Sequence, residues 1–215
     1  MVRRIQIETK LQKANDEIAN QNRIVFKQHN VFVINMMGSP GCGKTMLLEQ
    51  TVKLLSRYKM GVIEGDIATS RDADRLRNHR IPVALINTGG ACHLEARMIS
   101  KALAQLRLNE LDILFIENVG NLVCPASYDL GENKRVVLIS TPEGTDKVAK
   151  YPKMLREADL VLLNKIDMLD FSGFNLKIFK QDLLDLRGSS EFISISAKTK
   201  EGLANWIKWL NTSIK

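Results

Sequence analysis

The chain has 215 residues, of which 45% are hydrophobic and 26% are charged, and its 31 Lys and Arg residues exceed its 24 Asp and Glu residues to give a net charge of +7. These proportions indicate one folded globular domain, and no apolar run approaches the roughly 20 residues that span a membrane, so no membrane contact is expected. The basic residues form no block and accompany no RNA-binding signature, so no nucleic-acid partner is expected either.

Cysteine usage and the start of the chain indicate a cytoplasmic protein. The three cysteines are Cys42, Cys92 and Cys124. An odd number cannot pair completely, which favours a reducing compartment in which the thiols stay available for chemistry. The first residues are basic, but no apolar stretch follows them as it does in a secretory signal.

The chain is expected to begin with an amphipathic helix. Between residues 3 and 28, apolar side chains such as Leu11 and Ile18 recur near one helical face. We therefore assign residues 1–30 to an N-terminal helix that braces, from outside, a main domain formed by residues 31–215.

The main domain shows an alternation of strand and helix patterns. Strands are expected at 31–37, 61–65, 82–87, 112–117, 135–140, 159–163 and 192–195. Helices are expected at 46–57, 72–78, 93–106, 145–157, 176–187 and 202–214. This alternation predicts an α/β protein of three layers, in which helices cover both faces of a mostly parallel central sheet. Ligands of such sheets bind at the carboxyl ends of the strands.

Residues 38–45, Gly-Ser-Pro-Gly-Cys-Gly-Lys-Thr, fit the phosphate-binding P-loop pattern between an expected strand and an expected helix. Glycines let successive backbone N–H groups face phosphate oxygens, and the start of the helix adds its positive end. Lys44 is expected to reach the β- and γ-phosphates during catalysis, and Thr45 to hold Mg²⁺. The expected phosphate-binding residues are Gly38, Ser39, Pro40, Gly41, Cys42, Gly43, Lys44, Thr45 and Met46.

Two later loops predict that the nucleotide is GTP or GDP. Asn164-Lys165-Ile166-Asp167 follows an expected strand and fits the guanine-reading pattern N-K-x-D. The Asp167 carboxylate can accept hydrogen bonds from the guanine ring N–H and the exocyclic amine, a donor pair that adenine lacks. Lys165 would lie across the base and Asn164 would brace the loop. The second loop, beside the base, consists of Ser196, Ala197 and Lys198.

Three acidic residues are candidates for magnesium binding and water positioning, both of which phosphoryl transfer requires. Asp66 and Glu117 close two expected strands and would hold Mg²⁺ or its water ligands. Asp72 could orient the attacking water. The alternatives are a turn residue for Asp66 and a helix N-cap for Asp72.

A second, softer set of potential ligands consists of Cys92, His93 and Cys124. Thiolates and imidazole suit Ni²⁺ or Zn²⁺ rather than Mg²⁺. Taken alone, such residues are more often a packed cysteine and a structural Cys–His pair than a metal site. Three ligands also leave a tetrahedral site incomplete, so water or a second copy of the set across a two-fold interface would have to complete it.

The motifs together resemble those of the HypB family, the nickel-insertion GTPases of hydrogenase maturation. The strings are G-S-P-G-x-G-K-T, G-D-I-A, N-T-G-G-x-C-H-L, I-E-N-V-G-N-L-V-C-P-A and N-K-I-D, and the resemblance extends from Asn22 to the end. It implies a P-loop fold of the SIMIBI class, hydrolysis of GTP, and binding of Ni²⁺ or Zn²⁺ by Cys92, His93 and Cys124 near a dimer interface.

The resemblance further implies a metallochaperone that assists nickel insertion into the precursor of the [NiFe]-hydrogenase large subunit. Its expected partners are that precursor, a nickel-hydrogenase maturation protein, and a second copy of the chain in a homodimer promoted by GTP or metal. Two alternatives remain. A urease-type accessory GTPase shares the chemistry, but its hallmark is Cys-x-His, whereas Cys92 and His93 are adjacent. A GTP-gated regulatory module would pack the same cysteines and transfer no metal.

One departure from the family concerns the N-terminal residues. Some relatives carry a nickel-binding cysteine motif or a histidine-rich store there. Residues 1–30 hold no cysteine and only His29, so we expect both features to be missing from this segment.

Overall fold

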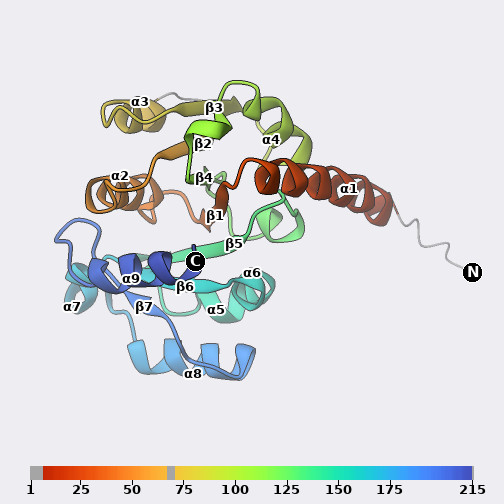
Figure 1. Ribbon diagram of the computed structural model, residues 1–215. Helices are drawn as coiled ribbons and strands as arrows, with labels where there is room; N and C mark the ends of the chain where they lie inside the picture. Colours follow the sequence, from red (N-terminus) through yellow and green to blue (C-terminus); the bar gives the residue numbers. More distant parts are fainter. Residues whose placement is uncertain (1–6, 67–70, 215) are drawn as a thin grey trace, which may run out of the picture.

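The central element of the fold is an all-parallel sheet of seven strands in the order β3-β2-β4-β1-β5-β6-β7, shown in the computed structural model of Figure 1. The structure describes the backbone of residues 7–66 and 71–214 and the side chains of 12–65 and 73–214. The strands are β1 (Phe32–Gly38), β2 (Met60–Asp66), β3 (Val83–Asn87), β4 (Ile113–Glu117), β5 (Lys134–Ser140), β6 (Leu160–Asn164) and β7 (Ile193–Ser194).

Helices cover both faces of this sheet, which confirms the predicted fold class. One face packs against α2 (Lys44–Leu54), α3 (Arg71–Arg77) and α9 (Leu203–Ser213). The other packs against α1 (Ile7–Gln28), α4 (Ala96–Leu103), α5 (Lys147–Lys150), α6 (Pro152–Glu157) and α8 (Leu176–Arg187). The remaining pieces are α7 (Leu169–Ser172) and the 3₁₀ turns η1 (Leu108–Glu110), η2 (Cys124–Ser127), η3 (Thr141–Glu143) and η4 (Ile166–Met168). Because both faces are covered, β4 and β6 are buried along their whole lengths, as their continuous apolar sequences require.

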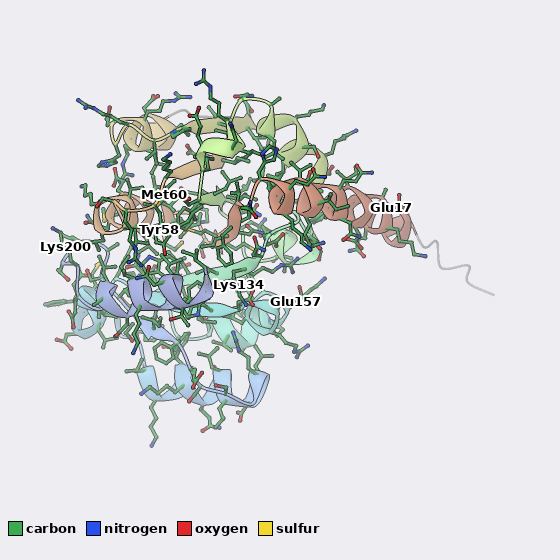
Figure 2. All side chains as sticks on the ribbon, in the orientation of Figure 1. Glu17, Tyr58, Met60, Lys134, Glu157 and Lys200 are labelled. Carbon is green, nitrogen blue, oxygen red and sulfur yellow. The ribbon has the colours of Figure 1, made fainter. Side chains whose placement is uncertain are left out.

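The N-terminal helix α1 lies alongside α4 (Figure 1). Phe26 is buried in the same apolar cluster as Leu94 and Ile99, and burial of one such side chain contributes about 1.5–3 kcal/mol. Glu17, on the opposite side of α1, points into solvent (Figure 2). The amphipathic pattern of this helix therefore corresponds to one buried and one solvated face.

Two expected helices differ from the structure in ways that affect the site. The helix expected over 93–106 begins only at Ala96, because the preceding Gly89 and Gly90 adopt positive φ and Glu95 is extended. The stretch expected as one helix over 145–157 is divided into α5 and α6 at Pro152. Proline has no N–H group and disfavours helical backbone in the residue before it, here Tyr151 at φ −126° and ψ 53°.

Candidate functional site

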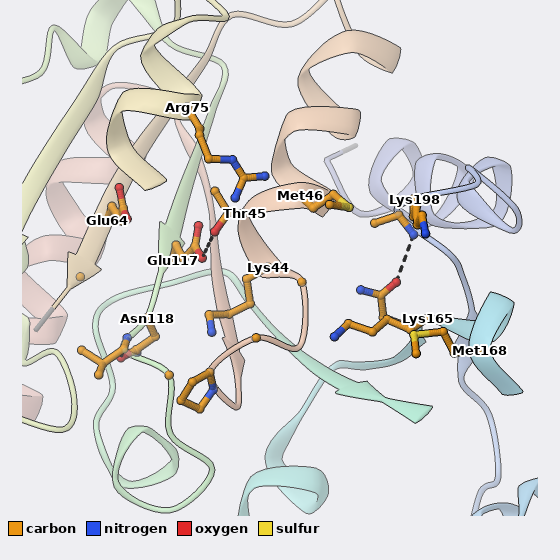
Figure 3. A pocket seen from close by; sticks show the side chains of 18 of the residues that line it. Lys44, Thr45, Met46, Glu64, Arg75, Glu117, Asn118, Lys165, Met168 and Lys198 are labelled. Carbon is orange, nitrogen blue, oxygen red and sulfur yellow. Dashed lines mark hydrogen bonds between the residues drawn. The ribbon is translucent and has the colours of Figure 1, made fainter. Parts of the chain in front are cut away.

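A cavity of about 500 Å³ opens at the carboxyl ends of the strands, where Figure 3 shows Lys44 near the hydrogen-bonded pair of Thr45 and Glu117. This size suits a small-molecule ligand. Its lining residues come from the P-loop, the ends of β2, β4 and β6, helix α3 and the loop after β7. They are Pro40, Gly41, Gly43, Lys44, Thr45, Met46, Glu64, Gly65, Arg75, Glu117, Asn118, Val119, Gly120, Asn164, Lys165, Asp167, Met168, Ala197 and Lys198.

The P-loop forms one wall of this cavity. Gly43 has a φ of +101°, and the turn that it makes lets α2 begin directly at Lys44 with its first N–H groups facing the cavity. Lys44 is 7% exposed, and its Nζ donates to the carbonyl oxygens of Gly38 (3.2 Å) and Ser39 (3.3 Å). The lysine is thus held over the loop, where an anion would replace the carbonyl contacts.

The opposite wall carries the guanine-reading motif. Asn164 is 1% exposed; its Nδ2 donates to Cys42 O (2.8 Å), and its Oδ1 accepts from Ala197 N (3.1 Å). It therefore ties the P-loop to the loop at 196–198. Oδ1 of Asp167 is buried and has no hydrogen-bond partner among the described residues, which leaves it available to a ligand.

A pair of carboxylates lies beside Thr45 on the side of the cavity away from Lys165 (Figure 3). The Thr45 hydroxyl donates to Glu117 Oε1 at 2.8 Å. Glu64 lies next to Glu117 in the register of β2 and β4, and both side chains are nearly buried, at 3% and 6% exposure. A hydroxyl and two carboxylates form the oxygen donor set that Mg²⁺ prefers.

Other residues singled out from the sequence lie at different positions around the cavity. The side chains of Asp66 and Asp72 lie outside the described residues; their backbones belong to β2 and α3. Ser39 donates from its hydroxyl to Glu143 below the P-loop. The buried hydroxyl of Ser196 accepts from Thr199 N (3.0 Å), which shapes the loop that presents Ala197 and Lys198.

Cys42 occupies a P-loop position, yet its side chain does not face the cavity. It is fully buried in the core with Leu47 and Leu138. Burial raises the pKa of its thiol to about 11, although Lys44 opposes the change. The backbone of Cys42 can contribute to the P-loop, whereas its thiol is part of the core.

Sequence reasoning missed several residues that line the cavity. Glu64 is a charged residue inside an otherwise apolar strand, a signal that could have identified it. Arg75 of α3 reaches the cavity beside Thr45 (Figure 3) while its Nη2 pairs with Glu49 Oε2 at 2.7 Å. No local pattern marks Asn118, because its side chain bonds to Leu94 N and Asn35 Oδ1, which are both distant in the chain.

The predicted transition-metal ligands form one cluster. The potential ligand atoms of Cys92, His93 and Cys124 all lie within 4.8 Å of one another, and each residue is half-buried. The distance from Cys92 Sγ to His93 Nδ1 is 3.5 Å. Residues separated by more than thirty positions in the chain thus converge on a point that one metal ion could occupy.

The surroundings of this cluster favour a neutral imidazole. The ring of His93 stacks on Tyr128 with centroids 3.9 Å apart. Burial lowers the pKa of His93, although Glu95, 3.8 Å from Nε2, opposes the change. A hydrogen bond with Cys92 raises the pKa of Cys124. Imidazole ligates metals in its neutral form, whereas the thiols must lose their protons, which a bound cation would promote.

One segment, residues 118–124, joins the nucleotide cavity to the metal cluster. Gly120 packs so tightly against the P-loop that an added Cβ would lie 2.8 Å from Pro40 N, and Asn121 forms a bridge with Gly38. Asn118 lines the cavity, and its Oδ1 accepts from Leu94 N (3.3 Å), directly after His93. A movement of this segment would reach both sites.

Comparison with known proteins gives one consistent result. Residues 32–194 match the family described as CobW/HypB/UreG, nucleotide-binding domain. The probable hydrogenase maturation factor HypB of Methanocaldococcus jannaschii is 42% identical over 204 residues, covering 94% of this chain and 92% of that protein. The hydrogenase/urease maturation factor HypB of Helicobacter hepaticus is 47% identical over 204 residues, covering 93% and 84%. The crystal structure of HypB from Helicobacter pylori in complex with nickel superposes with a TM-score of 0.89 at 41% identity, covering 94% of this chain and 95% of that one.

Proposed function

Because the chain belongs to the CobW/HypB/UreG family, and within it to the HypB hydrogenase maturation factors, it is a GTPase of nickel-hydrogenase maturation, and we propose that Cys92, His93 and Cys124 carry the nickel. The hydrolysis of GTP to GDP and phosphate would take place in the cavity around the P-loop. The metal cluster would hold the ion that is passed on.

For GTP, the cavity supplies an acceptor at one end and donors at the other. Asp167 Oδ1 would accept from the guanine N–H groups, with Lys165 across the base and Asn164 fixing the loop. Backbone N–H groups of residues 39–46 would bind the phosphates. Lys44 would exchange its carbonyl partners for phosphate oxygens and neutralise charge that grows during transfer.

Thr45, Glu117 and Asp66 are the residues proposed to hold Mg²⁺, directly or through water. When bound, the ion neutralises charge on the β- and γ-phosphates. The contact between Thr45 and Glu117 supports their assignment. We add Glu64 because it faces the same space, and we retain Asp72 as the residue proposed to orient the attacking water.

The metal cluster is proposed to take Ni²⁺, or Zn²⁺, as cargo. Two thiolates and an imidazole match the ligand preference of both ions. The described side chains supply three ligands within reach of one another. We propose that a homodimer places two such sets together at its two-fold axis, which would complete the coordination.

The partners and location are proposed by analogy with the relatives. We propose that the protein works in the cytoplasm with a maturation partner and with the precursor of the hydrogenase large subunit. None of the helices described within 7–66 and 71–214 is long and apolar enough to cross a membrane. The relatives and the solved structure named HypB do not favour the urease-type GTPase or the metal-free regulatory module.

The observation that carries this proposal is the physical connection between the cavity and the cluster through residues 118–124. The decisive experiment is a Ni²⁺ titration of the protein bound to GDP or to a non-hydrolysable GTP analogue. We expect the two affinities to differ by about 5- to 150-fold, a coupling of about 1–3 kcal/mol. Cys92→Ala should abolish most of the binding in both states, whereas Ser127→Ala, near Cys124 but without a thiol, should not.

Two results would contradict the proposal. Equal Ni²⁺ affinity in both nucleotide states would separate the two sites and remove GTP control of the metal. Ni²⁺ and Zn²⁺ binding that survives Cys92→Ala and His93→Ala together would place the cargo elsewhere.

A further inference from the structure

Helix α1 contacts both of the segments that carry metal ligands. The first ligand segment, residues 92–96, contains Cys92 and His93, and the second, residues 124–132, contains Cys124. Asn15 and Asn22 lie seven positions apart on α1, two helical turns along one face. Each of the two asparagines bonds to both ligand segments.

Asn15 bridges the segments with a single amide. Its Oδ1 accepts from Ala96 N (2.9 Å), and its Nδ2 donates to Asp129 O (2.8 Å). Asn15 is buried, with 7% of its surface exposed. Ala96 N is among the first-turn N–H groups of α4 that have no partner within that helix, so Asn15 also satisfies the end of α4.

Asn22 also bridges the two ligand segments, from a position two helical turns further along α1. Its Nδ2 donates to Ala96 O (2.9 Å) and to Leu130 O (3.1 Å), and the Ser100 hydroxyl donates to its Oδ1 (2.6 Å). The residue is 2% exposed, and both its Nδ2 and its Oδ1 have partners inside the protein. Burying an amide costs free energy unless its N–H and C=O groups are hydrogen-bonded, as they are here. An apolar residue could attach α1 to the domain without this desolvation cost.

Two further contacts fix the second ligand segment on α1. Arg23 Nη2 donates to both carboxylate oxygens of Asp129, at 2.9 Å to Oδ1 and 2.7 Å to Oδ2. Gly131 has a φ of +93°, and an added Cβ would lie 2.6 Å from Ala19 O. The segment therefore runs directly against the backbone of α1.

These contacts are close to the ligands themselves. Ala96 follows His93 by three residues. In the second segment, the 3₁₀ turn at Cys124–Ser127 leads directly to Tyr128, which stacks on His93. Metal–ligand distances tolerate only about 0.2 Å, so a small relative displacement of the two segments would separate Cys124 from the other two ligands.

We propose that Asn15 and Asn22 are positioning residues for the metal site: they hold the two ligand segments at the separation that lets one ion contact all three ligands. This proposal rests on the proposed function, because it requires the cluster to bind a metal. In this view the N-terminal helix preorganises the metal site from behind, without providing a ligand.

The test compares Asn15→Leu and Asn22→Leu with Gln21→Leu, which changes an exposed amide on the same helix. Leucine has the same branched shape as asparagine, with two methyl groups in place of the amide oxygen and nitrogen, and it removes the hydrogen bonds. Ni²⁺ titration by calorimetry should show affinity about 10-fold lower in the first two variants and unchanged in the third. The affinity for GTP should stay within about twofold of the parent value in all three. Bound Co²⁺ should show altered visible bands in the first two variants only, because those bands report ligand geometry.

A gentler pair keeps the test valid where leucine prevents folding. Ser100→Ala removes only the hydroxyl that orients Asn22, whereas Ser100→Thr retains it. We expect a Ni²⁺ affinity a few-fold lower for Ser100→Ala and the parent value for Ser100→Thr, with normal GTP affinity for both.

The outcomes separate this inference from the proposed function. If the parent protein binds no Ni²⁺ or if Cys92→Ala binds as well as the parent, the proposed function fails and the inference fails with it. If the parent binds through Cys92 and the folded Asn15, Asn22 and Ser100 variants all bind equally well, the inference alone is wrong. Parallel losses of Ni²⁺ and GTP affinity would show a general structural role and would also overturn it.

Discussion

The nucleotide cavity and the metal cluster stand side by side on one sheet but are held in place differently. Much of the cavity wall continues buried strands, so Gly38, Glu117 and Asn164 are fixed where β1, β4 and β6 end. The ligands of the metal cluster lie in loops and a 3₁₀ turn, which depend on packing from α1 and the ring of Tyr128. A site on strand ends is held by the sheet, whereas a site on loops can respond to its surroundings, as the proposed release of a metal ion would require.

The largest effect should come from removing the P-loop lysine. Lys44→Ala should lower the rate of GTP hydrolysis by about 10²- to 10³-fold, because the charge that develops on the phosphates loses its main side-chain donor. Ni²⁺ affinity measured without nucleotide should stay unchanged, which sharpens the contrast between the two regions. A malachite green assay of phosphate release gives the rate, and Lys53→Ala, exposed on the same helix, is the control. A normal rate for Lys44→Ala would remove this residue from catalysis.

Next in size is the loss of guanine recognition. Asp167→Asn should weaken GTP binding by about 2–4 kcal/mol, since a carboxylate that would accept two hydrogen bonds from guanine is replaced by a neutral amide. Fluorescence titration with a labelled GTP measures the change, and Asp170→Asn, exposed in α7, should have no effect. Equal affinity of the parent protein for GTP and ATP would refute the guanine assignment.

A smaller effect, on the binding of both GTP and Ni²⁺, should follow from a substitution in residues 118–124, which join the nucleotide cavity to the metal cluster. Gly120→Ala places a methyl group against the backbone of Pro40, which should destabilise the protein by about 1–3 kcal/mol and push residues 118–121 away from the P-loop. We expect weaker binding of both GTP and Ni²⁺. Gly173→Ala is a useful control, because its φ of +65° makes alanine strained there while open space surrounds its Cβ position. If Gly120→Ala affects only one ligand, the segment does not couple the sites.

The smallest change is expected at Cys42, which lies in the rigid region. With its pKa raised to about 11 by burial, this thiol should stay protonated and unreactive at pH 8. Iodoacetamide with a chelator present should label the two cysteines of the metal cluster in the native protein and all three after denaturation. Because the unfolded thiol ionises near pH 9 while the folded one stays protonated, Cys42 should also make stability decline as pH rises above about 9. Labelling of three thiols in the native state would contradict its burial.

The sequence by itself determined the sheet, the P-loop and the guanine-reading loops. Alternating apolar runs and helical patterns are local signals, and residues such as Lys44 and Asp167 are placed by the strand that each follows, which is why roles could be proposed for them from the sequence. The division of the 145–157 stretch at Pro152 was also visible locally and was missed. The cluster of Cys92, His93 and Cys124 could be named from the sequence through its resemblance to a family, but spacing alone left it open.

Only the tertiary structure decided what surrounds those ligands. Tyr128 stacks on His93, and Asn15 and Asn22 join residues 92–96 to residues 124–132, two segments that are distant in the chain. Glu64 faces Glu117 because β2 pairs with β4, a neighbour relation that chain order does not reveal. Such contacts depend on which strands and helices become adjacent on folding, and a buried asparagine looks the same in the sequence as an exposed one.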